Sequence, residues 1–401
     1  MGLLLLAGTG MGTAAESLDM LRYALSGGTP NLDLRLRYED VEQDNALENA
    51  DALTLRTRLG YTTAKWNDLD LMVELEDVHA LGGEDYNSCP GAGAPFFGDG
   101  CNGKTGFSLI ADPEDTELNQ FWLRYAGIPK TVLKYGRQRL VLDNHRFIGN
   151  VGWRQNEMTY DGLSVVNTAL PKLTIHYAHL TNANNIFGGD FQLQGDLLNL
   201  AWARSEALNL AGYAYFVDFD QDLAARRDTR TYGLRATGAV PLAPVKFLYA
   251  LEYASQDRHK DSPDSVEADY RLVELGAAYQ AVTGKLGYEV LGGDGVYGFQ
   301  TPLATLHAFQ GWADVFLNTP AAGVQDAYLS LGAVVEKFSF LAVYHDFSAD
   351  SGGADFGDEW DASLSRPIND NLSVMLKYAD YSAKDFAVDT EKLWVQAEYK
   401  F

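Results

Sequence analysis

The chain of 401 residues is 46% hydrophobic and 12% aromatic, yet its mean hydropathy is only −0.18. Beyond residue 15, no segment approaches the roughly 20 consecutive apolar residues that a membrane-spanning helix needs, which excludes a helical membrane protein. The formal net charge of −24 argues against nucleic acid as a partner.

The first 15 residues have the features of a secretory signal peptide. An apolar run ends in the small residues Thr13, Ala14 and Ala15, and cleavage is expected after Ala15. The positively charged start of such a signal is missing, so we expect a truncated signal, with a short buried helix as the alternative. Residues 16–30 are expected to form an N-terminal lead-in. Export would place the chain in the periplasm, in the outer membrane or outside the cell.

From residue 32 to residue 38, apolar residues alternate with Asp33, Arg35 and Arg37, which predicts a two-faced β-strand. Residues 53–61 and 69–76 repeat this pattern. The remaining predicted strands lie near residues 121–125, 131–137, 160–167, 173–177, 197–203, 208–219, 230–239, 245–255, 269–279, 285–291, 324–335, 338–347, 358–365, 372–382 and 389–401.

The connections between these strands alternate between long and short. Long segments are expected at 80–115, 138–157 and 292–323, whereas 127–130 and 282–284 are short turns. A soluble sandwich seldom keeps such a rhythm. We therefore predict an all-β fold for residues 31–401: a single transmembrane antiparallel β-barrel of about 18 strands, with short periplasmic turns and long extracellular loops. Such a lumen is wide enough for water and solute.

The last predicted strand, which ends at Phe401, should pair with the strand that starts near residue 31, because a membrane barrel leaves no open edge. Its polar face would then line the lumen. That face consists of Lys392, Trp394, Gln396, Glu398 and Lys400.

Cys89 and Cys101 lie in one glycine-rich stretch, and in an oxidising compartment they are expected to form a disulfide. A metal site would need further Cys or His residues nearby, and none is present in the sequence there. No cofactor is expected, and no catalytic motif is found.

Arginines dominate the predicted lumen wall. If the leucines of the first strand face lipid, Arg35 and Arg37 face the lumen, and the same argument turns Arg56 and Arg58 inward. Guanidinium groups bind carboxylates as bidentate forks, and rings of Arg and Lys favour anions in a pore. Two further candidates on polar strand faces are Arg124 and Arg235.

An alternative role for these arginines is structural. Asp70, Glu74 and Glu76 fall on the polar face of the next strand, where ion pairs across strands would stiffen the wall. The faces of Arg137, Arg139 and Arg154 cannot be assigned from the pattern. Their segment could fold into the lumen and constrict it, or pack as a surface loop, and 301–312 is a second candidate for an inward segment.

Several separated motifs resemble one known family, the alginate-export-type outer-membrane porins. They are Arg35-Leu-Arg-Tyr38, residues 53–61, Glu117-Leu-Asn-Gln120, Gly136-Arg-Gln-Arg139, residues 150–156, residues 306–312 and the closing strand. The resemblance implies an eighteen-stranded barrel in the bacterial outer membrane, with an electropositive constriction that passes anionic solutes. It also implies outer-membrane lipid as surroundings, and recognition of the strand ending at Phe401 by the barrel-assembly machinery.

We therefore expect a non-enzymatic porin that passes hydrophilic, preferentially anionic solutes by passive diffusion, with carbohydrates among the candidate solutes. One alternative is dedicated export of an acidic polysaccharide such as alginate. A second alternative is a structural or binding barrel that is plugged by its own loops. The sequence does not define an oligomeric state.

Overall fold

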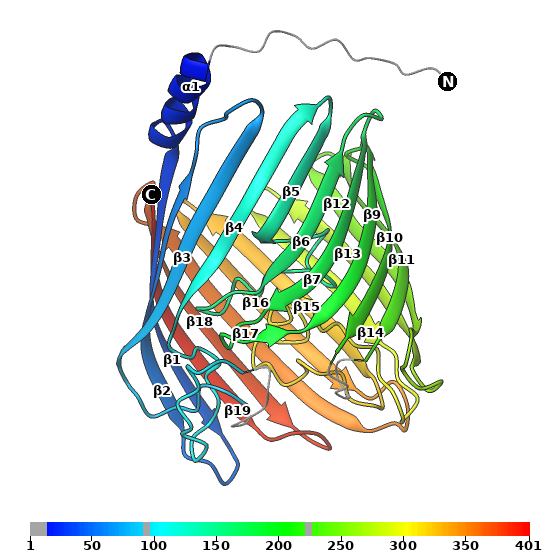
Figure 1. Ribbon diagram of the computed structural model, residues 1–401. Coiled ribbons are helices and arrows are strands. Elements are labelled where there is room, and N and C mark those ends of the chain that lie inside the picture. The colour runs from blue at the N-terminus through cyan, green and yellow to red at the C-terminus, as the bar shows by residue number, and fades with distance from the viewer. Residues whose placement is uncertain (1–13, 91–96, 221–226) are drawn as a thin grey trace.

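The computed structural model describes residues 14–90, 97–220 and 227–401, which form one closed barrel preceded by the helix α1 (Ala14–Ser26) (Figure 1). The strands are β1 (Thr29–Gln43), β2 (Ala50–Thr62), β3 (Leu69–Gly82), β4 (Asp115–Ile128), β5 (Thr131–Gln138), β6 (Thr159–Asn167), β7 (Leu173–Asn184), β8 (Asp190–Phe191), β9 (Leu193–Ser205), β10 (Leu208–Phe219), β11 (Thr229–Leu242), β12 (Val245–Arg258), β13 (Glu267–Tyr279), β14 (Val282–Leu291), β15 (Val324–Val335), β16 (Phe338–Ser348), β17 (Asp355–Pro367), β18 (Leu372–Ala383) and β19 (Thr390–Lys400).

Each wall strand pairs with its neighbours in antiparallel fashion, and β19 closes on β1. The two-residue β8 pairs with the end of β7 inside a long connection, so the wall of the described barrel consists of the other eighteen strands. Closure runs from Asp33 opposite Lys400 to Gln43 opposite Thr390. Reciprocal backbone hydrogen bonds between Leu32 and Phe401, at 3.0 and 2.9 Å, complete it. The predicted barrel class, strand number and closing pair are confirmed.

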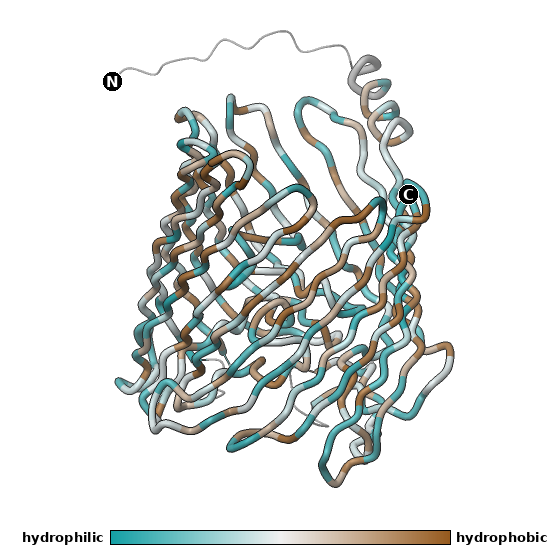
Figure 2. Tube along the Cα trace, turned by 180° about the vertical axis from the view of Figure 1, so that it is seen from behind, coloured by the Kyte–Doolittle hydropathy of each residue, from teal (hydrophilic) through white to brown (hydrophobic). Residues whose placement is uncertain are grey.

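Side chains alternate across the wall as the pleat of a β-strand requires. In β1, Leu36 is 40% exposed on the outer face, whereas Arg37 is fully buried on the inner face. Apolar and polar residues alternate along the strands of the whole wall (Figure 2). The outer face is therefore the lipid-facing surface, and the inner face carries the charged groups.

Short turns join the strands at the end of the barrel where both β1 and β19 have their terminal ends, and long loops lie at the opposite end. Two turns are tighter than predicted. Val282 and Thr283 pair with Tyr279 and Ala278, so the expected 282–284 turn lies at residues 280–281. Likewise β11 extends to Leu242, opposite Val245, which leaves a two-residue connection. Two-residue connections are the commonest in β-hairpins.

The N-terminal lead-in contains a helix that the sequence pattern did not predict. The predicted signal peptide falls almost entirely on residues that the structure does not describe, and it stays a prediction. The end of α1 contacts the short-turn end of the barrel, where the Tyr61 hydroxyl donates to the Leu25 carbonyl at 2.9 Å. Among the described residues, no helix has the length and apolar character to cross a membrane.

The hydrophobic core lies inside the barrel, in its long-loop half. It combines inward side chains of the strands with two loops that enter the lumen, residues 139–158 and 292–323. Phe147 contacts Tyr270 with ring centroids 5.3 Å apart, and Phe316 contacts Phe347 at 4.7 Å. The lumen is therefore much narrower than the strand number alone would allow. In the loop between β3 and β4, Cys89 and Cys101 form a disulfide.

Candidate functional site in the barrel lumen

The loop of residues 139–158 crosses the lumen and contacts the wall at two separate places. Arg154 donates four hydrogen bonds of 2.8 to 3.2 Å to the carboxylate of Glu39 on β1. Arg146 forms an ion pair of 2.7 Å with Glu289 on β14. Of the two alternatives for this segment, the structure has the inward fold.

The loop of residues 292–323 packs against the first loop. Gly149 N donates to Leu303 O at 2.8 Å, and Thr305 N donates to His145 O at 3.1 Å. Farther along, backbone N–H groups dock on β17: Ala313 N donates to Glu359 at 2.7 Å. The two loops therefore form one constriction, and the 301–312 segment is part of it.

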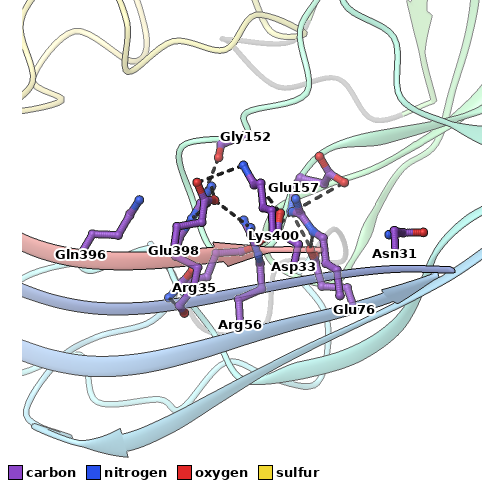
Figure 3. Close-up of polar contacts among 12 residues, drawn as sticks. Asn31, Asp33, Arg35, Arg56, Glu76, Gly152, Glu157, Gln396, Glu398 and Lys400 are labelled. Atoms are coloured by element: carbon purple, nitrogen blue, oxygen red, sulfur yellow. Dashed lines mark hydrogen bonds and ion pairs between the residues drawn. The ribbon is translucent and has the colours of Figure 1, made fainter. Parts of the chain in front are cut away.

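Two of the predicted pore-lining arginines hold this constriction in place. Arg37 donates to the carbonyl of Trp153 at 2.6 Å, and its guanidinium lies 4.2 Å from the Trp153 ring centroid. Arg35 donates to the Gly152 carbonyl at 3.0 Å and to Glu398 on β19 at 2.9 Å (Figure 3). Because Arg37 is fully buried, it does not contact a solute in this arrangement.

Arg56 and Arg58 also face inward, as predicted, but they are engaged in ion pairs of the wall. Arg56 donates to Asp33 at 2.7 Å (Figure 3) and is fully buried. Arg58 pairs with Glu76 on β3. For these two arginines the structure favours the alternative that they stiffen the wall. The loop residue Glu157 lies 3.6 Å from Arg58. Burial acts to raise the pKa of Glu157, but Arg58 and Arg139 outweigh it and lower the pKa to about 2.

Other inward cations remain accessible because their acidic partners lie behind them. The Arg124 side chain is 37% exposed and pairs at 2.5 Å with Asp70, which is 2% exposed. Arg139 is 32% exposed and pairs with Glu74, which is 3% exposed. The same arrangement holds for the pairs Arg235 with Glu252, Lys285 with Glu274 and Lys400 with Glu398. Lys285 was missed, although its alternation with the exposed Leu286 could have identified it.

Arg137 is the predicted pore-lining residue that the structure contradicts. It lies on β5 opposite Phe121, on the same face as the exposed Tyr135, and this is the outer face of the barrel. Its guanidinium pairs with Asp161 on β6 at 2.9 Å. The prediction failed because Arg137 was grouped with the irregular segment that follows it, whereas it still belongs to the alternating strand.

Two cavities adjoin the constriction, and both are lined by Asn150 and Gly152 of the first loop. A cavity of about 850 Å³ is lined by residues that include Trp153, Trp312, Arg235, Lys285 and Lys377. A second, of about 390 Å³, is lined by residues that include Arg35, Arg58, Arg139 and Lys400. Basic side chains thus border the accessible space on both sides of the loop.

At the edge of the larger cavity, Lys377 of β18 contacts both loops. Its Nζ lies 2.6 Å from His307 Nε2, and it lies 4.0 Å and 3.7 Å from the ring centroids of Trp153 and Trp312. His307 is stacked on Trp153 with centroids 4.4 Å apart. The sequence could not reveal this cluster, because strand alternation does not show which loop segments fold against the wall.

His307 is neutral in this cluster. Burial lowers its pKa well below its usual value although Asp314 opposes the shift, and Lys377 adds to it. Nδ1 lies 2.7 Å from Asp314. A neutral imidazole has one donor and one acceptor. Nδ1–H therefore donates to Asp314 and Nε2 accepts from Lys377. In the described ranges, no group of three or more His, Cys, Asp or Glu residues could hold a metal ion.

A closed barrel with an apolar outer face, short turns at one end and long loops at the other defines a β-barrel of the bacterial outer membrane. The alginate export family profile matches residues 29–291, well over half of the chain, and the chain belongs to this family. A comparison with curated proteins finds no match.

Solved outer-membrane proteins share the fold at low sequence identity. OpdK of Pseudomonas aeruginosa, determined with vanillate, is 14% identical with a TM-score of 0.73, over 94% of this chain and 99% of that one. OccK9 (OpdG) of the same organism gives 14% and 0.74 over 94% and 99%. OccAB4 of Acinetobacter baumannii gives 14% and 0.70 over 93% and 98%. The predicted family resemblance and the outer-membrane location are confirmed.

Proposed function

We propose that this protein is a porin that passes small anionic solutes by passive diffusion around the loops in its lumen. The proposal rests on the unequal exposure of the two partners in the accessible ion pairs. In the pairs of Arg124, Arg139, Arg235, Lys285 and Lys400, the cation is more exposed than its acid. A solute in the lumen would therefore meet the positive partner first, although each pair is neutral as a whole.

The exposed cations act on a solute only at close range, along the lumen wall. Charges at the wall of a narrow aqueous path act at close range in a space where water screens them poorly, and exposed Arg and Lys groups attract anions there. The overall charge of −24 does not oppose this, because the acids that belong to these pairs are buried behind the cations. Exchange between successive accessible cations would let an anion move without binding tightly at one place.

The solute class that fits is a small carboxylate. Guanidinium groups match carboxylates in geometry, and ammonium groups bind them as point charges. OpdK, which shares the fold, was determined with vanillate, an aromatic carboxylate, and this supports the same class of solute here. The cavities of about 850 and 390 Å³ beside the constriction have room for a small solute, and we treat export of an acidic polymer as the weaker alternative.

A barrel plugged by its own loops is the second candidate. It is favoured by the hydrophobic core that the loops form in the long-loop half, with Phe299 and Phe347 fully buried. A plugged barrel would show no conductance in planar bilayers until one of the loops is shortened. A porin would show stepwise conductance without any change to the loops.

Charge removal at the accessible cations tests the proposed selectivity. The double variant Arg124→Gln, Lys285→Gln keeps the wall strands and the buried acids, and it should lower the ratio of anion to cation permeability. The matched control is Arg271→Gln, because Arg271 lies on the outer face with its side chain 60% exposed. An unchanged ratio in the double variant, or an equal loss in the control, would contradict the proposal.

A further inference from the structure

Arginines on the outer face of the wall strands fall into two groups by position. Three lie toward the long-loop end and each forms an ion pair with an aspartate: Arg137 with Asp161, Arg230 with Asp257 and Arg271 with Asp269. Arg204 and Arg366 lie at the short-turn ends of β9 and β17. In the ranges that the structure describes, neither of these two forms an ion pair with a carboxylate. The chain thus leaves two guanidinium groups at one rim of the barrel without an anion.

The guanidinium of Arg366 rests on an aromatic ring. It is exposed and lies 4.9 Å from the ring centroid of Phe338, the first residue of β16. A guanidinium has five N–H donors, and in the described part of the chain no acceptor meets those of Arg366. A charged side chain on the lipid side of a barrel is costly unless it is paired or reaches the interface. We therefore expect its anion to come from the surroundings.

Arg366 lies at one end of a largely apolar groove of about 480 Å³ on the outer face of the barrel. In this groove, Ala397 of β19 carries only a methyl group between its register partners Leu36 of β1 and Val374 of β18. Leu36 and Val374 are 40% and 37% exposed, so they rise above Ala397 on both sides. Val374 is also the register partner of Arg366. The unpaired cation and the groove are therefore adjacent.

The groove leads from the rim toward the middle of the wall. Tyr38 and Leu53, which pair with each other farther from the short turns, also line it. Short turns of such barrels lie on the periplasmic side, so Arg366 is at the level of lipid headgroups and the groove is at the level of acyl chains. Guanidinium groups bind phosphates as bidentate forks. A cation at the headgroup level beside an apolar groove fits a lipid with a phosphate and a long chain.

We propose that this groove is a binding site for a phospholipid of the periplasmic leaflet. The lipid phosphate binds Arg366, and one acyl chain lies along Ala397. Because the site is on the lipid side of the wall, it does not depend on the proposed passage of anions through the lumen. It assigns a defined lipid partner to one part of the outer face.

Native mass spectrometry of the full chain in detergent measures this binding, with palmitoyl-oleoyl phosphatidylglycerol as the probe. Palmitoyl-oleoyl glycerol has the same chains without the phosphate and is the comparison lipid. The wild-type protein should bind phosphatidylglycerol about tenfold more tightly than the comparison lipid, because hydrogen bonds to charged groups are the stronger ones.

Three variants assign the two parts of the site. Arg366→Gln should lose the preference for phosphatidylglycerol. Ala397→Leu should weaken the binding of both lipids, because leucine fills the groove. Arg271→Gln on the outer face is the matched control and should behave as wild type, since Arg271 already has Asp269 as its partner.

Equal binding of the two lipids by the wild type, or equal binding of phosphatidylglycerol by Arg366→Gln and Arg271→Gln, would overturn the proposal. A dimer that forms without lipid and is lost in Ala397→Leu would assign the groove to a second copy of the chain, and would overturn it as well. If Ala397→Leu does not assemble, the comparison of Arg366→Gln with Arg271→Gln still decides.

Discussion

The ammonium nitrogen of Lys377 lies 2.6 Å from Nε2 of His307, and this contact joins the wall strand β18 to a loop inside the lumen. Arg37 makes the corresponding contact for the other loop through the carbonyl of Trp153. The inward cations thus divide into two groups. Buried ones hold the constriction, and exposed ones, such as Arg124, border the space that a solute would use.

Removing Arg37 should destabilise the barrel. In Arg37→Met, the buried carboxylate of Asp112, 3.7 Å from Arg37, loses a cation, and the Trp153 carbonyl loses a donor. Breaking such a buried pair costs about 3 to 5 kcal/mol. Denaturant unfolding in detergent, followed by tryptophan fluorescence, measures the free energy. Arg271→Met on the outer face is the control, and an equal loss in both variants would contradict the buried role.

Acid should loosen the constriction through His307. Its pKa in the folded protein lies well below the value of about 6.5 that it has in an unfolded chain. The unfolded state then binds more protons between these two values, so the closed loops lose stability as pH falls below about 6.5. Burial acts to raise the pKa of Asp314, but the hydrogen bond from His307 and the charges of Lys392 and Arg154 outweigh it and hold the pKa well below its usual range, so Asp314 does not titrate in this window.

Single-channel recording between about pH 7.5 and about pH 5 measures this effect as more frequent opening at the acidic end. His307→Gln, which keeps a hydrogen-bonding side chain without a titratable group, should remove most of the pH dependence. If the pH dependence of opening is unchanged in this variant, a titratable group other than His307 causes it.

Gly311 should be required for the loop to dock on β17. Its φ is +78°, and an added Cβ would lie 2.2 Å from a carboxylate oxygen of Glu359. Gly295 in the same loop has a φ of +90° with nothing within 4 Å of an added Cβ, which makes it a matched control. Both Gly→Ala variants bear a strain of about 1 to 2 kcal/mol, and Gly311→Ala should in addition expose the loop to thermolysin. Equal cleavage of the two variants would contradict the tight contact.

The C-terminal residue Phe401 should be needed for assembly into the outer membrane but should contribute little to the stability of the folded barrel. Phe401 is 70% exposed, and its contacts with Leu32 are backbone hydrogen bonds that any residue can make. Phe401→Ala should therefore lower the amount of barrel inserted in the outer membrane, while the purified variant keeps wild-type thermal stability. Normal insertion would count against recognition of this strand by the barrel-assembly machinery.

The wall of the barrel was predictable because a β-strand places successive side chains on opposite faces. One alternating strand thus assigns Arg35 and Arg37 to the lumen, and the register of β1 with β19 confirms the predicted closing pair. The same rule would have placed Arg137 on the outer face with Tyr135. Its pattern was available, because the predicted strand of residues 131–137 includes Arg137, but Arg137 was interpreted together with the irregular segment that follows.

The contacts inside the lumen were not predictable in the same way. Trp153 and His307 lie in segments without periodicity, and they meet through a fold that joins residues far apart in the chain. Strand alternation shows that Arg56 faces inward, but only the packing of Asp33 and Glu398 around it shows that it is fully buried. The pattern therefore predicts which face a charge is on, and the loops decide whether a solute can reach it.

The central claim is that the protein is an anion-selective porin. The most direct test is to measure the reversal potential of the wild-type protein in a planar bilayer with a KCl gradient and to read its sign. We expect stepwise conductance, because the protein is proposed to be an open porin. We also expect chloride to be more permeant than potassium, because the side chains of Arg124, Arg139 and Lys285 are exposed in the lumen. A reversal potential of the opposite sign, with potassium more permeant, would contradict the anion-selective porin.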